Sequence, residues 1–411
     1  MPRLAISFCF AAAFLSTPAS ADDISVVAGT GRLQAAIDAA PAEARLLLQP
    51  GVYKGAIRVE QPLSLIGGQG VILDGGGQGR VLTVDAPNVR ISGLTIVNSG
   101  TSLATEDSAI FVTERGDHVL IENNRLEDNL IGIYLKGPEQ AQVIGNIIRG
   151  SLNPHMNDRG NGIHIWNATG ALIAENRLRY GRDGIFVMTS LNNIYRNNHF
   201  EDMRFAVHYM YTHHSELRGN QSLRNHSSYA LMFSDYIKVI GNYSDAARDR
   251  GLFLNAVNYS DFEQNVVRGG TEKCLFIYNA NFNRFRANRF EACEIGIHFT
   301  AGSEKNTIFG NSFIDNRNQV KYVGTRHIEW SFEEQGNYWS DNPGFDLNHD
   351  GIADRPYRPN DLVDQIIWRY PLAKLLLNSP ATQLIRWAQA EFPALHPGGV
   401  TDSAALMGPP L

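Results

Sequence analysis

Between residues 122 and 311 the hydrophobic and polar positions repeat every 22 or 23 residues, apart from one interval of 30. Each repeat contains a short segment of alternating apolar positions, such as Ile163-His-Ile165 and Ile185-Phe-Val187. This alternation is typical of a β-strand with one buried face, and a fixed period of this length is typical of stacked supersecondary units. The pattern predicts an all-β fold, a right-handed parallel β-helix of roughly 11–13 coils.

The landmark of each repeat is an asparagine, followed in most copies by an apolar residue one or two places later. The landmarks are Asn124, Asn146, Asn176, Asn198, Asn220, Asn242, Asn265, Asn288 and Asn311. Asparagine suits left-handed corners between strands. We therefore expect these residues to occupy such corners and to stack into a side-chain ladder that serves as scaffold.

The sequence on either side of the repeat indicates how the rod begins and ends. Leu33, Ala36 and Ile37 share one helical face within residues 32–48, as expected of a helix that covers the open N-terminal end. The whole chain divides into a signal peptide (1–21), the β-helix (22–335), a calcium-like loop (336–359), and C-terminal helices with an extended tail (360–411).

Residues 1–21 have the pattern of a secretory signal: Arg3, an apolar run from Leu4 to Leu15, and Ala19-Ser20-Ala21 before two aspartates. This segment is too short to span a bilayer. Its removal takes away Arg3 and changes the formal net charge from −6 to −7. The sequence thus predicts an exported protein that does not itself span the membrane. An acidic chain without a basic block is also a poor ligand for nucleic acid.

Two cysteines, Cys274 and Cys293, remain after the signal. They are 19 residues apart in a 23-residue repeat and therefore out of register by four positions, about 13 Å along an extended chain. This offset argues against a disulfide, although the compartment permits one.

Sulfur and imidazole side chains share one outward face of the predicted rod. Ten residues before successive landmarks stand Trp166, Met188, Met210 and Met232, and twelve before stand His164, Phe186, His208 and Ala230. Thioether and imidazole ligands together select copper, above all Cu(I). The 30-residue interval adds a loop with further candidates. The candidate copper ligands are Met188, Met210, Met232, His208 and His164, with His155 and Met156 of the loop as second choices.

Two other interpretations of this face compete with a copper site. An outward apolar stripe also fits packing beneath a loop or a partner, where methionine fills gaps well. Exported β-helices are often carbohydrate-active enzymes, which need paired carboxylates or a base and an acid in a groove. The Asn153-Pro-His-Met156 segment has asparagine and methionine where an alginate epimerase has carboxylates. We therefore expect no enzyme activity. The alternative is a carbohydrate-active or carbohydrate-binding β-helix protein of the lyase or epimerase type.

A second metal motif follows the repeat. Oxygen ligands at positions 1, 3, 5, 7 and 9, with glycine at 6, match the first part of a calcium loop, although Tyr357 replaces the glutamate of position 12. The candidate ligands are Asp346, Asn348, Asp350, the carbonyl of Ile352, and Asp354. The alternative is an Asp/Asn/Gly turn held by its own backbone bonds.

The C-terminal segment is predicted to be helical between residues 360 and 392. Leu372, Leu375 and Leu376 form one apolar face, and Ser379 with Pro380 opens a second helix. These helices either cover the far end of the rod or dock on another protein. The candidate partner surface comprises Trp166, Phe186, Phe253, Leu384 and Trp387.

Several motifs together resemble the NosD family. They are Gly162-Ile-His-Ile-Trp-Asn167, Val207-His-Tyr-Met210, Ala230-Leu-Met-Phe233, Gly336-Asn-Tyr-Trp-Ser-Asp341, the Asp346–Asp354 loop, and Trp368-Arg-Tyr-Pro-Leu372. NosD proteins are periplasmic subunits of the NosDFY ABC transporter, which helps to mature nitrous oxide reductase. The resemblance implies a copper-associated assembly factor with four partners: the transporter permease and ATPase, a copper chaperone lipoprotein, and the reductase. The residues leave open whether the cargo is copper or a sulfur species.

Overall fold

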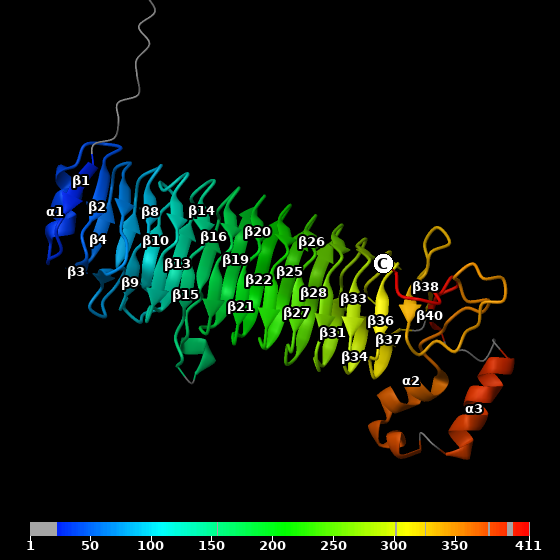
Figure 1. Ribbon diagram of the computed structural model, residues 1–411. Helices are drawn as coiled ribbons and strands as arrows, with labels where there is room; N and C mark the ends of the chain where they lie inside the picture. The colour runs from blue at the N-terminus through cyan, green and yellow to red at the C-terminus, as the bar shows by residue number, and fades with distance from the viewer. Residues whose placement is uncertain are drawn as a thin grey trace, which may run out of the picture.

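The computed structural model describes residues 23–153, 155–300, 302–324, 326–376, 379–392 and 398–410. The predicted signal peptide lies outside these residues. The described chain forms a long rod of consecutive coils, blue at its N-terminal end and yellow near its C-terminal end (Figure 1). From β5 to β34, each strand pairs in parallel with the strands three places before and after it. The predicted parallel β-helix is confirmed, and its three sheets of 13, 12 and 13 strands agree with the expected coil number.

The β1 sheet contains, in pairing order, β1 (Asp23–Val26), β2 (Arg45–Leu48), β5 (Ser64–Ile66), β8 (Arg90–Ser92), β11 (Leu120–Glu122), β14 (Gln142–Ile144), β17 (Leu172–Ala174), β20 (Ile194–Arg196), β23 (Glu216–Arg218), β26 (Lys238–Ile240), β29 (Asp261–Glu263), β32 (Arg284–Arg286) and β35 (Thr307–Phe309).

The β3 sheet contains β3 (Gly51–Lys54), β6 (Val71–Asp74), β9 (Thr95–Val97), β12 (Arg125–Glu127), β15 (Ile147–Arg149), β18 (Arg177–Arg179), β21 (His199–Glu201), β24 (Gln221–Leu223), β27 (Tyr243–Asp245), β30 (Val266–Arg268), β33 (Arg289–Glu291), β36 (Ser312–Ile314) and β39 (Tyr338–Trp339).

The β4 sheet, which carries the methionines, has the longest strands: β4 (Ile57–Val59), β7 (Leu82–Val84), β10 (Ser108–Val112), β13 (Ile131–Lys136), β16 (Ile163–Trp166), β19 (Asp183–Leu191), β22 (Phe205–His213), β25 (Ser227–Asp235), β28 (Arg250–Asn258), β31 (Lys273–Tyr278), β34 (Ile295–Thr300) and β37 (Asn318–Val323).

The core is a continuous apolar column inside the coils. In the β4 sheet the inward positions predicted from the alternation, such as Ile163 with Ile165 and Ile185 with Val187, are fully buried. Their alternate neighbours therefore point outward, because successive side chains of a strand lie on opposite faces. This arrangement fixes which side chains are available on the outer surface.

The landmark asparagines form the expected ladder between the β1 and β3 sheets. Asn198, for example, donates from Nδ2 to Oδ1 of Asn220 at 3.0 Å, and Asn220 does the same to Asn242 at 2.9 Å. The expectation that these asparagines are left-handed is wrong. The positive φ belongs to the preceding residue, such as Asn197 (54°) or Gly219 (62°). The corner residue turns the chain, and the buried asparagine after it bonds to backbone groups of neighbouring coils, as Asn198 does to the carbonyl of Ile173.

The ladder continues one coil beyond the predicted repeat. Asn311 donates to Asn337, 26 residues later, and Asn337 donates from Nδ2 to Oδ2 of Asp402 at 3.1 Å. The backbone N–H of Asn337 and the indole N–H of Trp339 also donate to this oxygen, at 2.7 and 2.8 Å. The fully buried Asp402 therefore ends the stack.

Both ends of the rod are covered. At the N-terminal end α1 (Arg32–Ala39) buries Leu33 and Ile37, as predicted. At the other end the described part of the last segment, residues 398–410, is not the extended tail we expected. Its strand β40 (Gly399–Thr401) pairs with β38 (His327–Glu329), and Val400 and Ala405 are buried.

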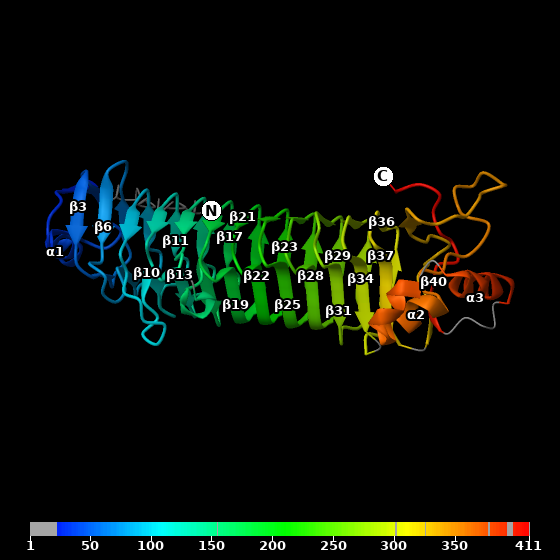
Figure 2. The ribbon, with the colours of Figure 1, turned by 90° about the horizontal axis from the view of Figure 1, so that it is seen from below.

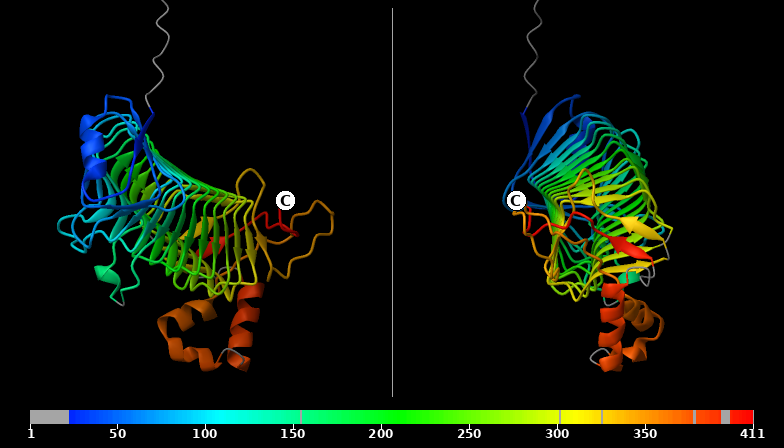
Figure 3. Two further views of the ribbon diagram at one scale, coloured as in Figure 1. Left: turned by 60° about the vertical axis from the view of Figure 1, so that its left-hand side comes forward. Right: turned by 90° about the vertical axis from the view of Figure 1, so that its right-hand side faces the viewer.

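Two helices and a 3-10 segment project from this end to one side of the stacked coils (Figures 1 and 3), so that in the view from below α2 lies in front of the end of the rod (Figure 2). They are α2 (Leu362–Arg369), η2 (Pro371–Leu376) and α3 (Pro380–Glu391). Ser379 caps α3 by accepting from the Thr382 N–H, as expected. The leucines of η2 do not cover the rod: Leu375 is 88% exposed. The end is covered by the returning tail instead.

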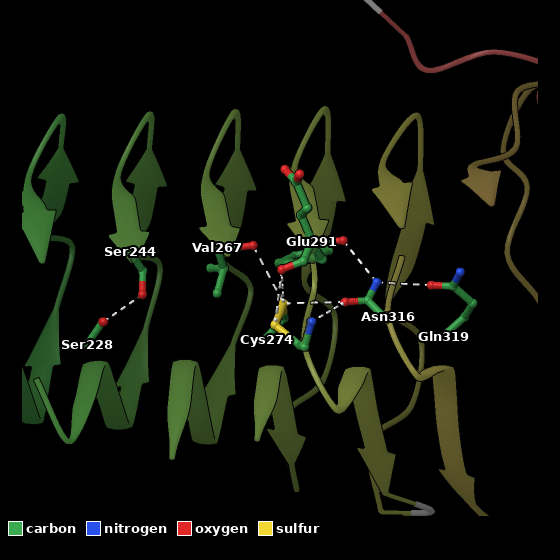
Figure 4. Close-up of a disulfide and its surroundings, with 9 residues drawn as sticks. Ser228, Ser244, Val267, Cys274, Glu291, Asn316 and Gln319 are labelled. Carbon is green, nitrogen blue, oxygen red and sulfur yellow. Dashed lines mark hydrogen bonds between the residues drawn. A yellow bond between two sulfur atoms is a disulfide. The ribbon is translucent and has the colours of Figure 1, made fainter. Parts of the chain in front are cut away.

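Cys274 and Cys293 form a disulfide with their Cα atoms 5.8 Å apart (Figure 4), which corrects the expectation from spacing. Cys274 lies in β31, whereas Cys293 follows β33 at the corner before β34. The chain turns at this corner. The four-residue offset between the two cysteines therefore does not separate them by the length of four residues of straight strand. Both cysteines are buried, and the Sγ of Cys274 lies 3.5 Å from the carbonyl oxygen of Val267.

We expect the Cys274→Ala/Cys293→Ala variant to lose about 3 kcal/mol of unfolding free energy, because the bond closes a loop of some 20 residues in the unfolded chain. Urea denaturation of both proteins measures the loss, and dithiothreitol in the unfolding buffer should remove the difference. Two free thiols in the protein purified without reductant would contradict the assignment.

Candidate functional site: a methionine and histidine face

The three methionines lie side by side on the outer surface of the β4 sheet. Trp166 pairs with Met188, Met188 with Met210, and Met210 with Met232, in the consecutive strands β16, β19, β22 and β25. All three methionines are half-buried, and Trp166 is exposed. Adjacent strands are about 4.8 Å apart, so the outer two methionine backbones are about 10 Å apart. The flexible side chains of all three can reach the space above Met210.

A second outward column carries the imidazoles within a stack of rings. The ring centroids of Tyr134 and His164 lie 4.2 Å apart, those of His164 and Phe186 5.0 Å, and those of Phe186 and His208 4.9 Å. Phe186 is only 8% exposed, so its assignment to an exposed partner surface needs correction. It belongs to the packing of this face, and it separates His164 from His208.

His208 is held by a buried carboxylate. Its Nδ1 lies 3.2 Å from Oδ2 of Asp183, and Arg204 donates two bonds to the same carboxylate at 2.8 and 2.6 Å. Burial of Asp183 alone would raise its pKa, but the bonds from His208 and Arg204 and the charge of Arg204 hold the pKa below its usual value. Asp183 is therefore an ionised acceptor that favours a proton on Nδ1 of His208.

The other ring nitrogen of His208 is available as a ligand. Nε2 is buried and has no hydrogen-bond partner among the described residues. A histidine that ligates a metal typically donates its second ring N–H to a carboxylate, which orients the ring and fixes the tautomer. His208 has this arrangement, and Met210 is two residues away on the same face. The donor set suits a soft cation such as Cu(I).

The remaining copper candidates, His164, His155 and Met156, do not join His208 and the three methionines. Desolvation by burial, followed by the charge of Arg182, lowers the pKa of His164 to about 4, so its imidazole is neutral at neutral pH. It is nevertheless enclosed between Tyr134 and Phe186. His155 and Met156 lie in the long loop, Met156 within η1 (Met156–Asp158), before β16 and thus at the edge where strands of the β4 sheet begin. The methionines stand in the later half of their strands, towards the opposite edge.

The described residues include no group of three or more His, Cys, Asp or Glu side chains placed to hold a metal ion. The soft donors on this face are the thioether sulfur atoms of Met188, Met210 and Met232, next to the imidazole of His208.

The calcium-like loop has its carboxylates turned towards its own backbone. Oδ1 of Asp346 accepts from the His349 N–H at 2.6 Å, and Oδ2 accepts from Gly351 at 2.9 Å. The Gly351 bond, the largest cause, and the bond from His349 lower the pKa of Asp346. Asp350 and Asp354 likewise accept from the N–H groups of Ile352 and Leu347, both at 2.8 Å. These bonds fit the Asx-turn alternative and keep Asp346 ionised, as a calcium ligand must be.

Comparisons with known proteins agree with the motifs. Residues 144–344 match the family described as "Periplasmic copper-binding protein (NosD)". A "Probable ABC transporter binding protein NosD" of Stutzerimonas stutzeri is 41% identical over 379 residues, covering 89% of this chain and 87% of the relative. A relative of the same description from Pseudomonas aeruginosa is 42% identical over 384 residues, 90% of each chain. The chain belongs to the NosD family.

The solved structures that resemble this NosD-family chain support the fold alone. An exopolygalacturonase of Yersinia enterocolitica superimposes with a TM-score of 0.57 at 12% identity, over 75% of this chain and 78% of the enzyme. One from Thermotoga maritima gives 0.56 at 12% identity, over 74% and 93%. The NosD relatives are named as binding proteins of a transporter and not as enzymes. Among the helices of the described residues, none has the length and apolar character needed to span a membrane.

Sequence reasoning missed two features of this face. Asp183 begins β19 and is fully buried beneath Arg204 and His208. The available signal in the sequence was an aspartate directly before the inward residues Gly184 and Ile185. That position suggests burial, and a buried carboxylate needs a charged or hydrogen-bonding partner. The other feature is the row of exposed aromatic rings at the strand ends, which is described below.

Proposed function

We propose that this chain is a non-enzymatic, periplasmic Cu(I)-binding subunit of an ABC transporter complex, and that it supports maturation of the copper–sulfide centre of nitrous oxide reductase. The NosD family membership supports the periplasmic, copper-associated role. The single observation that carries the site is the Nε2 of His208, which has no hydrogen-bond partner among the described residues, beside the row of Met188, Met210 and Met232, here called the methionine line. His208 and Met210, with Met188 and Met232, would hold the ion.

Metal analysis of the reductase tests this function. Reductase isolated from a strain that lacks this protein should contain less copper and no copper–sulfide centre, and the wild-type chain supplied in trans should restore both. A sulfur-delivering role would instead leave the copper content high while the centre lacks sulfide. Normal copper and sulfide in the deletion strain would overturn the proposal.

The C-terminal helices are proposed as the docking site for the transporter permease and its ATPase. Leu384 is 64% exposed and Trp387 58% exposed on α3, and the leucines of η2 are also exposed. Large exposed apolar patches are typical of interaction sites. Trp166 and Phe253, on the β4 sheet, would belong to a different contact, such as one with the copper chaperone lipoprotein or the reductase.

The Leu384→Ser/Trp387→Ser variant should co-purify with permease and ATPase at least tenfold less well, since burying each side chain is worth roughly 1.5–3 kcal/mol. Deleting residues 379–411 is a poorer test, because it also removes Asp402 from the end of the rod. Leu347→Ser, at a 76% exposed leucine outside the helices, is the matched control. Equal recovery of the double variant and this control would contradict the proposed contact.

For the second metal motif, we expect Ca²⁺ to bind the Asp346–Asp354 loop with a Kd of about 10⁻⁴–10⁻³ M, since the bidentate glutamate is missing. Isothermal titration calorimetry should show heat of Ca²⁺ binding for wild type and for the control Asp315→Ala, but not for Asp346→Ala/Asp350→Ala. Identical titrations of both variants would favour the backbone-bonded turn.

The alternative function is binding of an anionic carbohydrate, and one feature favours it. A groove of about 940 Å³ over the β3 sheet is lined by four arginines and three glutamates, and Glu127 and Glu201 pair with two of the arginines, Arg125 and Arg179. The other two arginines are Arg149 and Arg177. The guanidinium groups of Arg149 and Arg179 lie 5.6 and 4.6 Å from the ring centre of Tyr180. Titration with polygalacturonate tests this binding, and release of unsaturated or reducing sugars would show an enzyme instead.

A further inference from the structure

The corner that joins the β4 sheet to the β1 sheet carries a row of exposed aromatic rings. Six residues before successive landmarks stand His214, Tyr236, Tyr259 and Phe282. Their rings stack in order, with centroids 4.9, 5.3 and 4.8 Å apart and planes within 13° of parallel. Tyr211 and Phe233 form a parallel pair 5.1 Å apart at the preceding turn of the same corner. We call these six residues the aromatic corner.

The backbone of this corner does not require aromatic residues. His214, Tyr236, Tyr259 and Phe282 are all left-handed, with φ between 51 and 59°. The same position in the two preceding coils holds Gly170 and Asn192, the residue types that adopt this conformation most readily. Bulky side chains are disfavoured there, and stacking offsets only part of that cost. Tyr236 and Tyr259 are in addition about half exposed, so burial in the core does not explain them.

The orientation of the rings selects the kind of partner. A sugar stacks on the open face of an aromatic ring, but here the interior faces of the row are turned towards one another. The row presents ring edges, tyrosine hydroxyl groups and imidazole nitrogen atoms to the outside. Exposed tyrosine-rich surfaces of this kind are typical of protein interfaces.

The aromatic corner is continuous with the methionine line. Tyr211 directly follows Met210, and Phe233 directly follows Met232. His213 and His214 lie three and four residues after Met210, and Nδ1 of His213 accepts from the Asp235 N–H at 3.1 Å. A protein bound on this corner would therefore place its own metal ligands next to imidazole and thioether donors of this chain.

We propose that the aromatic corner is the docking surface for a Cu(I)-carrying protein that exchanges its ion with the methionine line. This inference rests on the proposed copper-binding function. The exchange moves Cu(I) from donors of one protein to His and Met donors of the other. No change of oxidation state and no covalent step are involved.

Site-specific photo-crosslinking in cells tests the occupant. With p-benzoylphenylalanine in place of Tyr259, irradiation should give an adduct with a second protein, and that protein should bind Cu(I) when isolated. The same replacement at Phe345, an exposed ring of the calcium-like loop, is the matched control and should not give this adduct. An adduct with another copy of this chain, with the permease or with a glycan would overturn the proposal, as would no adduct.

A variant that suits the backbone separates docking from folding. Tyr236→Asn/Tyr259→Asn should keep or raise the melting temperature and keep the Cu(I) affinity of the purified chain within twofold. The copper carried by the chain recovered from cells grown on trace copper should nevertheless fall at least fivefold. Unchanged loading in cells, or a lower melting temperature, would overturn the docking role. Failure of the purified wild-type chain to bind Cu(I) would instead reject the copper function itself.

Discussion

Replacing Met188 and Met210 together with leucine should weaken Cu(I) binding more than 100-fold while the fold is kept. Leucine matches methionine closely in volume and removes only the sulfur ligand, so the half-buried outer face stays packed. His208 alone, with Met232 to one side, cannot provide the soft donor set that holds Cu(I). Competition titration against a Cu(I) chelator under reducing conditions measures the change.

Controls for this prediction come from the same chain. Met156→Leu alters a methionine of the long loop, near the opposite edge of the β4 sheet, and should leave the affinity unchanged. Asp183→Asn should weaken binding about 10- to 100-fold, the usual effect of removing the partner that orients a metal-ligating histidine. If Met156→Leu has the larger effect, the site lies in the loop. Equal affinities of wild type and the double variant would exclude the methionine line.

The rod itself was readable from the sequence because a β-helix repeats one local solution. The apolar alternation at Ile163-His-Ile165 and its counterparts specifies which face is inward, and constant pitch then places Met188, Met210 and Met232 in register. The asparagine ladder also followed from the spacing of the landmarks, but the left-handed residue is the one before each landmark asparagine. The left-handed corner was predicted one residue too late because asparagine suits both the corner and the buried position after it.

What the sequence did not reveal depends on contacts between residues far apart in the chain, or on the path of the chain through a corner. Cys293 meets Cys274 because the coil turns between them, which a count of register positions along an extended strand ignores. Asp402 lies 65 residues from Asn337, in a segment rich in Pro, Gly and Ala that has the composition of a tail. Asp183 likewise has no local pattern that announces its pairing with Arg204 and His208.

Asp402→Ala should destabilise the C-terminal end of the rod by about 4 kcal/mol, because each buried donor left without a partner costs roughly 1–3 kcal/mol. The donors affected are the N–H and Nδ2 of Asn337, Nε1 of Trp339 and the N–H of Ala404. Burial raises the pKa of Asp402 while these donors oppose the shift, so the carboxylate depends on them as much as they depend on it. Asp402→Asn retains one acceptor oxygen and should lose about half as much.

Tryptophan fluorescence during urea unfolding reports this effect directly, since Trp330 and Trp339 are buried at the same end and Trp339 donates to Asp402. The midpoint should fall most for Asp402→Ala, less for Asp402→Asn, and not for Asp350→Ala in the exposed loop. The coils pair only with their neighbours, so loss of the last contact should fray the rod from this end and make the transition broader. Coincident transitions for all three variants would mean that the ladder ends at Asn337 without help from the returning chain.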